Sequence, residues 1–270
     1  MSLLRGIISG LVYDADAQAY FDAVETAGGS FDLTGINALY TENYIKRKHN
    51  DFVLALKGYN LWSSMDHILL LSGKTYAAIA VPLKGFTSIS FSNFVLSDYL
   101  SAGSGLGLTG DALTKYINTA VVLASNSDAS MSVFGTVADA TTRNSTEMGA
   151  YNSAGVTHNS IRLNGYSPEK AWQAGNAGIG ANDTDCDAFL CANSVGSNGS
   201  LYKDGISIAG PTTVGSPSTN AIHIFAERSN SVPNNYSQRT LSFAHIGGTL
   251  GAKVPDLNLA IQTFMTSLGK

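Results

Sequence analysis

The stretch that decides the fold reads Thr240-Leu-Ser-Phe-Ala-His-Ile-Gly-Gly-Thr-Leu250, and a second patterned stretch follows it from residue 254 to 268. The first alternates with the two-residue period of a strand that buries one face. In the second, apolar residues recur every three or four positions, as on one face of a helix; they are Val254, Leu257, Ile261, Phe264, Met265 and Leu268. Pro255 suits the first turn of this helix and Gly269 its end. We therefore predict a strand that leads into a short C-terminal helix.

Short alternating segments continue upstream, from about Phe86 onward, separated by clusters of Gly, Asn, Ser and Asp. This spacing is typical of a β-sandwich. Asp204-Gly205 lies between two such segments. Because a type I′ turn needs positive φ at both central positions, we expect a two-residue hairpin there. Other strands are predicted to begin at Ser88, Lys115, Ser130, Ser160 and Ala221.

Residues 14 to about 72 have a helical period instead. Asp14 or Asp16 can cap a first helix that Gly28-Gly29 ends, a second helix is predicted up to Gly58, and a third, turn-rich segment up to Gly73. We expect a mainly β protein divided into a helical N-terminal docking segment (1–84), a β-sandwich (85–250) and a C-terminal helix (251–270). The apolar face of that last helix packs either on the sandwich or on a neighbouring subunit of a homo-oligomer.

Composition excludes two classes of partner. Charged residues form 13% of the 270 residues and the formal net charge is −4, whereas a nucleic-acid surface needs clustered Lys and Arg. The one basic run, Lys46-Arg47-Lys48-His49, is expected on the solvent face of a helix. No apolar run approaches the roughly 18 residues of a membrane span, and Arg5 interrupts the apolar start, so neither membrane insertion nor a signal peptide is expected.

Several segments in order along the chain resemble a known family. They are Asp14 to Gly29, Asn50 to Lys57, Leu61 to Met65, Gly110 to Tyr116, Leu201 to Gly205, Leu241 to Gly247 and Phe264 to Gly269. Together they are similar to small tailed-phage structural proteins with a concanavalin A-like (LamG-like) jelly-roll sandwich. The resemblance does not extend to residues 140–200, where the loops are private to this chain.

The resemblance implies a non-enzymatic virion protein, assembled in a host cytoplasm as a tail fibre, tail-tip or head-surface component. Its partners would be other virion proteins and a host-surface glycan, and its role attachment or particle decoration. A cement protein without a ligand is a third, weaker possibility. The alternative is a carbohydrate-active hydrolase or depolymerase on the same jelly-roll fold, with Asp183 or Asp185 in an unconventional carboxylate pair.

Known catalytic spacings are absent from the sequence. Sandwich glucanases use Glu-x-Asp-x-x-Glu on a strand, and no glutamate beyond residue 26 has an aspartate two positions later. Glu227 lies beside Arg228, which indicates a surface ion pair. No G-x-S-x-G elbow occurs, and the five histidines show no spacing that would place a base beside a nucleophile.

Asp183, Asp185 and Asp187 form the one acidic cluster. In an extended segment they share a face and could offer Ca²⁺ three carboxylates, although the EF-hand positions fail, so a solvated loop is the competing interpretation and no cofactor is required. Cys186 and Cys191 are expected as free thiols, while their spacing leaves a bridge open.

Four aromatic residues lie in Asn-, Ser- and Gly-rich surroundings and are the candidate ligand-binding residues; they are Tyr151, Tyr166, Trp172 and Tyr236. An exposed ring there could stack on a sugar. The competing interpretation is that Trp172 fills the core, as tryptophans usually do.

Overall fold

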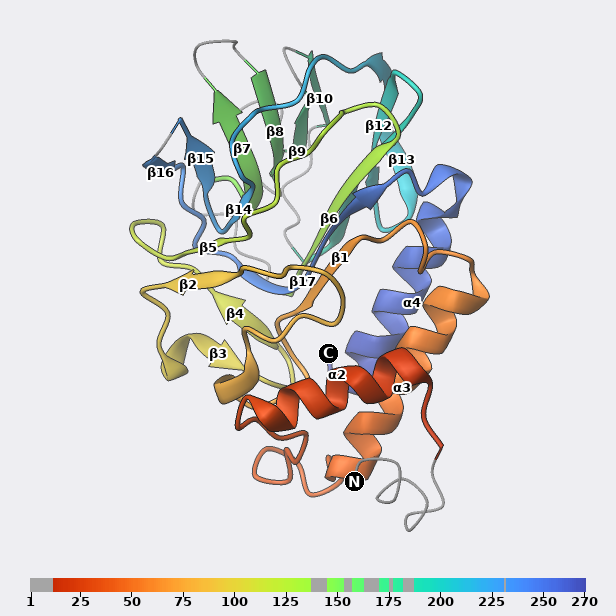
Figure 1. The fold of residues 1–270 in the computed structure, drawn as a ribbon, viewed down its shortest axis with the longest axis vertical. Coiled ribbons are helices and arrows are strands. Elements are labelled where there is room, and N and C mark those ends of the chain that lie inside the picture. The colour runs from red at the N-terminus through yellow and green to blue at the C-terminus, as the bar shows by residue number, and fades with distance from the viewer. Residues whose placement is uncertain are drawn as a thin grey trace.

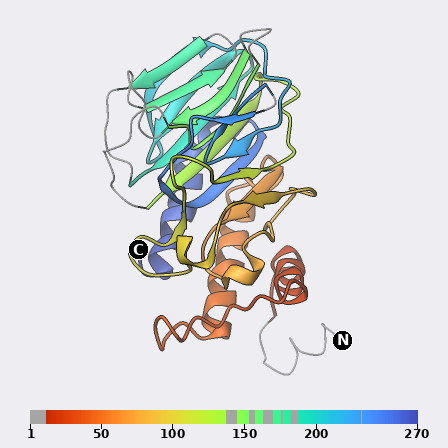
Figure 2. The same cartoon turned by 90° about the vertical axis from the view of Figure 1, so that its left-hand side faces the viewer.

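The computed structural model describes residues 12–136, 145–152, 157–162, 170–174, 177–181, 187–230 and 232–270, with the backbone alone for 170–174 and 177. Two largely antiparallel sheets face each other, and the described helices gather on the outer side of one of them (Figures 1 and 2). The prediction of a mainly β sandwich with an N-terminal helical region and a C-terminal helix is confirmed.

The first sheet has eight strands: β1 (His67–Leu70), β3 (Tyr99–Leu100), β4 (Gly107–Thr109), β6 (Ala129–Gly135), β11 (Phe189–Val195), β12 (Asn198–Lys203), β13 (Ile206–Thr213) and β17 (Thr240–Gly248). Their order is β13-β12-β11-β6-β17-β4-β3, and β1 also pairs with β17. The stretch that decides the fold is thus a central strand of this sheet.

The second sheet has nine strands: β2 (Ser90–Ser92), β5 (Tyr116–Asn118), β7 (Met148–Asn152), β8 (Thr157–Arg162), β9 (Lys170–Ala174), β10 (Ala177–Ala181), β14 (His223–Ile224), β15 (Glu227–Ser229) and β16 (Val232–Asn234). Their order is β10-β9-β8-β7-β14-β5-β2; β15 runs parallel to β7 and carries β16 at its side. All other pairs in this sheet are antiparallel.

The helices are α2 (Ala15–Thr26), α3 (Glu42–Gly58) and α4 (Val254–Ser267), with short 3-10 turns η1 (Tyr76–Ala78), η2 (Leu96–Asp98) and η3 (Gly251–Lys253). Asp14 caps α2 by accepting a hydrogen bond from the Asp16 amide at 3.0 Å. The apolar stripe of α4 is buried in the same chain, against α3 and the eight-stranded sheet. That packing accounts for the stripe without a neighbouring subunit.

Two apolar cores hold the three layers together. Successive residues of β6 show the division, because Val133 packs between the two sheets while Phe134 packs under the helices. Phe243 of β17 also lies on the helical side, with its ring 6.4 Å from that of Phe52 on α3. The nine-stranded sheet therefore buries one face against its partner sheet, and none of the described helices covers the other face (Figure 2).

The structure corrects one boundary. Residues 62–69 were expected to form a helical, turn-rich segment, but residues 67–70 are strand β1, whose Ile68, Leu69 and Leu70 are all buried. A strand buried on both faces has no alternation to distinguish it from a buried helix. The second helix begins at Glu42, where Thr41 caps it by accepting a hydrogen bond from the Tyr44 amide. The docking role of residues 1–84 stays a prediction.

The hairpin at Asp204-Gly205 has the predicted geometry. Asp204 has φ 49° and Gly205 φ 80°, which is the pair of positive values that a two-residue I′ turn requires. Asp204 also accepts a hydrogen bond from the Phe189 amide at 2.9 Å, which ties the turn to the start of β11.

One lysine is buried beneath α2. The Lys74 ammonium donates to the Tyr20 hydroxyl at 3.0 Å and to the Val81 carbonyl at 2.6 Å, and no carboxylate pairs with it in the described part of the chain. Burial lowers the pKa of Lys74 to about 7.

No helix among the described residues is long and apolar enough to cross a bilayer.

Candidate functional site

The outer face of the nine-stranded sheet carries polar and aromatic side chains. On β7 and β8 the core residues are Met148, Ala150 and Ile161, so alternation places Gly149 and Tyr151 on the outer face. The register pairs Tyr151 with His158 and Gly149 with Ser160, which puts both partners on that face too. The outer face of this sheet thus carries the aromatic rings of Tyr151 and His158 beside polar side chains.

No side chain fits at Gly149. A Cβ at this position would lie 2.7 Å from the Ser160 Cβ and 3.0 Å from the Asn159 carbonyl oxygen. Any side chain would displace the neighbouring strand, so glycine is required here for packing.

Tyr151 and His158 stack on each other, with ring centroids 4.1 Å apart and an interplanar angle of 22°. Both side chains are half-buried. His158 Nδ1 lies 3.4 Å from Glu227 Oε1, and the other oxygen, Oε2, accepts a hydrogen bond from Asn235 Nδ2 at 3.0 Å. Tyr151 is thus a predicted ligand-binding residue that the structure brings together with two residues that were not predicted.

Glu227 is 3% exposed, so it is not the surface carboxylate expected from its neighbour Arg228. Successive residues of a strand point to opposite faces, and Glu227 and Arg228 are successive on β15. Among the described residues the partners of the Glu227 carboxylate are His158 and Asn235. The predicted surface ion pair is wrong for this geometric reason.

A second aromatic stack lies further along the same sheet. The Tyr116 ring of β5 lies 4.8 Å from the His223 ring of β14 at an angle of 18°, and the Tyr236 ring lies 6.3 Å from that of Tyr116. Burial, together with the charge of Arg228, lowers the pKa of His223 to about 4, so this imidazole is neutral at pH 7. Tyr236, a predicted ligand-binding residue, is therefore part of an aromatic cluster on this sheet.

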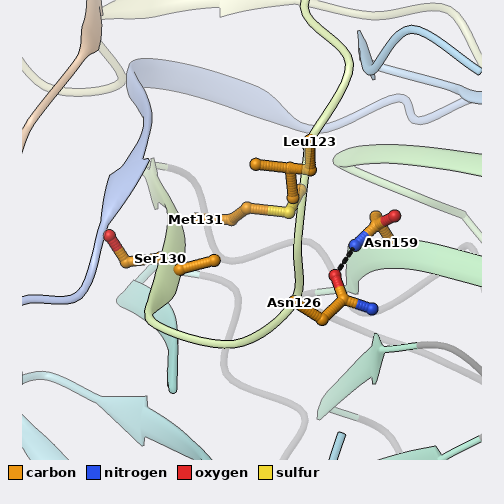
Figure 3. A pocket seen from close by; sticks show the side chains of 6 residues that line it. Leu123, Asn126, Ser130, Met131 and Asn159 are labelled. Atoms are coloured by element: carbon orange, nitrogen blue, oxygen red, sulfur yellow. Dashed lines mark hydrogen bonds between the residues drawn. The ribbon is translucent and has the colours of Figure 1, made fainter. Parts of the chain in front are cut away.

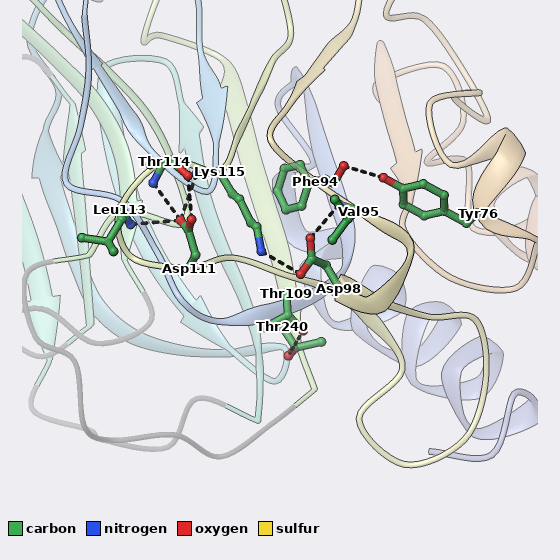
Figure 4. Close-up of polar contacts among 10 residues, drawn as sticks. All are labelled: Tyr76, Phe94, Val95, Asp98, Thr109, Asp111, Leu113, Thr114, Lys115 and Thr240. Atoms are coloured by element: carbon green, nitrogen blue, oxygen red, sulfur yellow. Dashed lines mark hydrogen bonds and ion pairs between the residues drawn. The ribbon is translucent and has the colours of Figure 1, made fainter.

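The turn before β5 is held by Asp111 (Figure 4). Its carboxylate accepts hydrogen bonds from the amides of Leu113, Thr114 and Lys115 and from the Thr114 hydroxyl, at 2.7–3.0 Å. Partial burial opposes ionisation, but these hydrogen bonds outweigh it and hold the pKa of Asp111 well below its usual range. The turn delivers the chain directly to Tyr116.

A second buried carboxylate lies beside the site. Glu147 is fully buried just before β7, where its Oε1 accepts hydrogen bonds from the hydroxyls of Ser145 and Ser237, both at 3.1 Å. Glu227 pairs in register with Gly149, two residues along β7 from Glu147. Two glutamates thus flank one position of the sheet.

Of the remaining predicted residues, the structure describes the side chains of Asp187 and Cys191 only, and neither lies in this site. Trp172 lies on β9 in register with Ile161 and Ile179, both of which are core residues. Asp187 forms an ion pair with Lys270. Cys191 is a buried free thiol. Tyr166, Asp183, Asp185 and Cys186 lie outside the described residues, and within the described ranges no three His, Cys, Asp or Glu side chains gather as a metal site would need.

Two hollows lie elsewhere in the described structure. A recess between the sheets is lined by Asn126, Asn159, Met131 and neighbours (Figure 3), but it has no water-sized space and Asn159 donates its hydrogen bond to Asn126. A groove of about 160 Å³ between α3 and α4, lined by Phe52, Tyr59 and Leu259 among others, lies on the helical side of the molecule.

Comparisons with known proteins found solved structures only. No protein-family model and no curated protein sequence matches the chain. A mutant of Trypanosoma rangeli sialidase with trans-sialidase activity matches at a TM-score of 0.48 and 15% identity, over 82% of this chain and 39% of that one. Domain 4 of AbnA, a GH43 extracellular arabinanase from Geobacillus stearothermophilus in complex with arabinotriose, matches at 0.45 and 14%, over 72% and 98%. The NanB sialidase from Streptococcus pneumoniae matches at 0.35 and 12%, over 48% and 24%.

These structures correct one expectation. All three come from glycoside hydrolases, so the expectation that this protein is not an enzyme is contradicted and is given up. None of the three is a virion protein. The chain spans 39% of the first sialidase. Every one of these TM-scores is below 0.5.

Proposed function

We propose that the protein binds carbohydrate on the outer face of the nine-stranded sheet. The observation that carries this proposal is the half-buried Tyr151 ring, which stacks on His158 beside the buried Glu227 carboxylate. Tyr116 and Tyr236 add a second aromatic group on the same sheet. The face therefore offers rings and a few fixed polar groups together.

This combination fits the chemistry of a sugar. A pyranose or furanose ring has apolar C–H patches that pack on aromatic rings, and hydroxyls that need directed donors and acceptors. Two side-chain amides near Tyr151 are fixed by hydrogen bonds. Asn220 Nδ2 donates to the Tyr151 carbonyl at 2.5 Å, and Asn235 Nδ2 donates to the Glu227 carboxylate at 3.0 Å. Such preorganisation lowers the entropy that is lost when a hydroxyl-rich ligand binds.

Hydrolysis of the bound glycan is the second candidate. Glycoside hydrolases place two carboxyl groups about 5 to 9.5 Å apart on either side of the scissile bond. The strand register places both Glu147 and Glu227 near Gly149. Only Glu227 contacts the stacked rings directly, through His158. In this alternative Glu227, rather than Asp183 or Asp185, is the first carboxylate to test.

The setting on a virion is also part of the proposal and is supported by the sequence resemblance. Several copies held on one particle would raise the effective concentration of weak sites, and avidity can then exceed single-site affinity by about 10² to 10⁴. Antibody labelling of purified particles in the electron microscope tests this setting, and absence of label from the particle would remove it.

Binding is tested by affinity electrophoresis in gels that contain dextran, mannan, arabinan or alginate. Tyr151→Ala should weaken the retardation seen for the wild type about two- to tenfold, since an aromatic stack contributes about 0.5–1.5 kcal/mol. Tyr151→Phe keeps the ring and should retain binding. Tyr59→Ala removes a half-buried tyrosine from the helical side and is the matched control. Equal losses in Tyr151→Ala and Tyr59→Ala would refute the assignment of this face.

Hydrolysis is tested on the same polysaccharides by the release of reducing ends. Activity that Glu227→Gln abolishes while electrophoretic retardation persists would establish the second candidate. Retention of full activity in that variant would exclude Glu227 from the chemistry.

A further inference from the structure

The imidazole of His158 has one nitrogen with no hydrogen-bond partner among the described residues. Its side chain is 19% exposed, its Nδ1 faces Glu227 Oε1 at 3.4 Å, and none of the described residues bonds to its Nε2. Two contacts from two other strands hold this ring: the Tyr151 ring of β7 stacks on it, and the Glu227 carboxylate of β15 faces its Nδ1.

The ring plane and the ring edge are fixed by different neighbours. Stacking on Tyr151 at 4.1 Å and 22° sets the plane of the imidazole. The Glu227 carboxylate selects the Nδ1 edge, and it is itself held because Asn235 Nδ2 donates to Oε2 at 3.0 Å. Glu227 is 3% exposed, so little water competes for its oxygens.

The carboxylate also determines where the imidazole proton lies. An ionised carboxylate can only accept hydrogen bonds, so the Nδ1 that faces it must be the N–H donor. In a neutral imidazole the other nitrogen, Nε2, then has a free lone pair and no proton. In an unrestrained imidazole the opposite tautomer, with the proton on Nε2, predominates.

We propose that Glu227 positions His158 as an Nδ1–H imidazole whose Nε2 accepts a hydrogen bond from a hydroxyl of the bound sugar. This inference rests on the proposed carbohydrate-binding function and names one contact of that site. His158 is the residue that touches the ligand, and Glu227 is a positioning residue that acts through it. A hydroxyl donor is required, because a ligand group that only accepts hydrogen bonds would face the Nε2 lone pair.

The first experiment needs no sugar. Two-dimensional ¹H–¹⁵N NMR through the imidazole couplings, at pH 9 and well above the ordinary histidine pKa of about 6.5, distinguishes the two neutral tautomers. His158→Gln identifies the His158 signals among the five histidines. The expected result is a protonated Nδ1 in the wild type and a return to the Nε2–H form in Glu227→Met. A wild-type His158 in the Nε2–H form overturns the inference, whatever the protein binds.

The second experiment uses the polysaccharide that retards the wild type most in the electrophoresis above. His158→Ala and Glu227→Met should each weaken retardation about tenfold, and the double variant should be no weaker than His158→Ala, because Glu227 acts only through the ring. Losses that multiply in the double variant would overturn the positioning role. A wild type with the Nδ1–H tautomer and no retardation by any polysaccharide would instead refute the carbohydrate-binding proposal.

Discussion

Replacing Lys74 with methionine tests how the buried ammonium controls the pH dependence of stability. Lys74 is fully buried, and its pKa falls from 10.5 to about 7 on folding. Between these values the unfolded chain binds the proton that the folded chain has lost, so the free energy of unfolding rises with pH. Linkage gives an increase of about 2 kcal/mol between pH 7 and pH 9 from this residue alone.

The range from pH 7 to pH 9 separates the titration of Lys74 from that of other groups whose pKa is shifted by folding. Burial lowers the pKa of His49 and of His245 to about 3, so their contributions rise as pH increases toward 6.5 and are complete below this window. Burial raises the pKa of the Cys191 thiol above its ordinary value of 9.0 and that of Tyr20 above 10.0, so both lower stability only at higher pH. Between pH 7 and 9 the Lys74 contribution therefore stands out.

Urea unfolding of the wild type and of Lys74→Met at half-unit steps from pH 7 to 9 is the assay. The wild type should gain stability with pH and the variant should lose that gain, whatever the cost of leaving the Tyr20 hydroxyl and the Val81 carbonyl without their donor. Lys57→Met is the control, because the hydrogen bonds that its ammonium donates to Asp14 and Asp16 raise the pKa of Lys57, so its titration lies above the window. Parallel curves for the wild type and Lys74→Met would refute the reasoning.

Three further changes test the packing and the turns by urea unfolding at pH 7. Asp111→Ala removes the acceptor of four hydrogen bonds and should cost about 1–3 kcal/mol; since folding lowers the pKa of Asp111, its stabilisation is lost as pH falls below 3.8, and this part of the acid loss should disappear in the variant. Gly205→Ala places a Cβ 3.0 Å from the Pro255 Cα at φ 80° and should cost about 1–2 kcal/mol, whereas an unchanged midpoint would contradict the turn geometry. Phe243→Ala empties a fully buried position under the helices and should cost about 3–5 kcal/mol; a loss below 1 kcal/mol would contradict the packing.

The parts of the fold that could be predicted are those whose signals are local. The hairpin at Asp204-Gly205 follows from two adjacent residues, and the buried face of α4 follows from a period within one helix. Strand β1 was missed because Ile68, Leu69 and Leu70 are buried on both faces of the sheet, which removes the alternation that marks a strand. Its identity depends on its pairing with β17, far along the chain.

The candidate site shows the same division. Tyr151 and Tyr236 could be selected from their Asn-rich surroundings, but the contact between His158 and Glu227 joins residues 69 positions apart and depends on how β7, β8 and β15 pair. One signal was available: adjacent residues in a strand point to opposite faces, so Glu227 and Arg228 were poor partners for each other. Nothing in the sequence alone identifies His158 as the partner of the Glu227 carboxylate.

The pairing of β1 with β17 has a consequence for synthesis. The ribosome delivers the chain from the N-terminus, and β1 is among the first strands to emerge whereas β17 is the last. Strand β17 also joins β6 to β4, so the eight-stranded sheet has a gap at its centre until residue 248 is free. During translation the earlier strands keep exposed edges, and contacts of such long sequence separation form slowly. We therefore expect the nascent chain to depend on chaperones until β17 has emerged, and any fragment that stops before residue 240 to be insoluble.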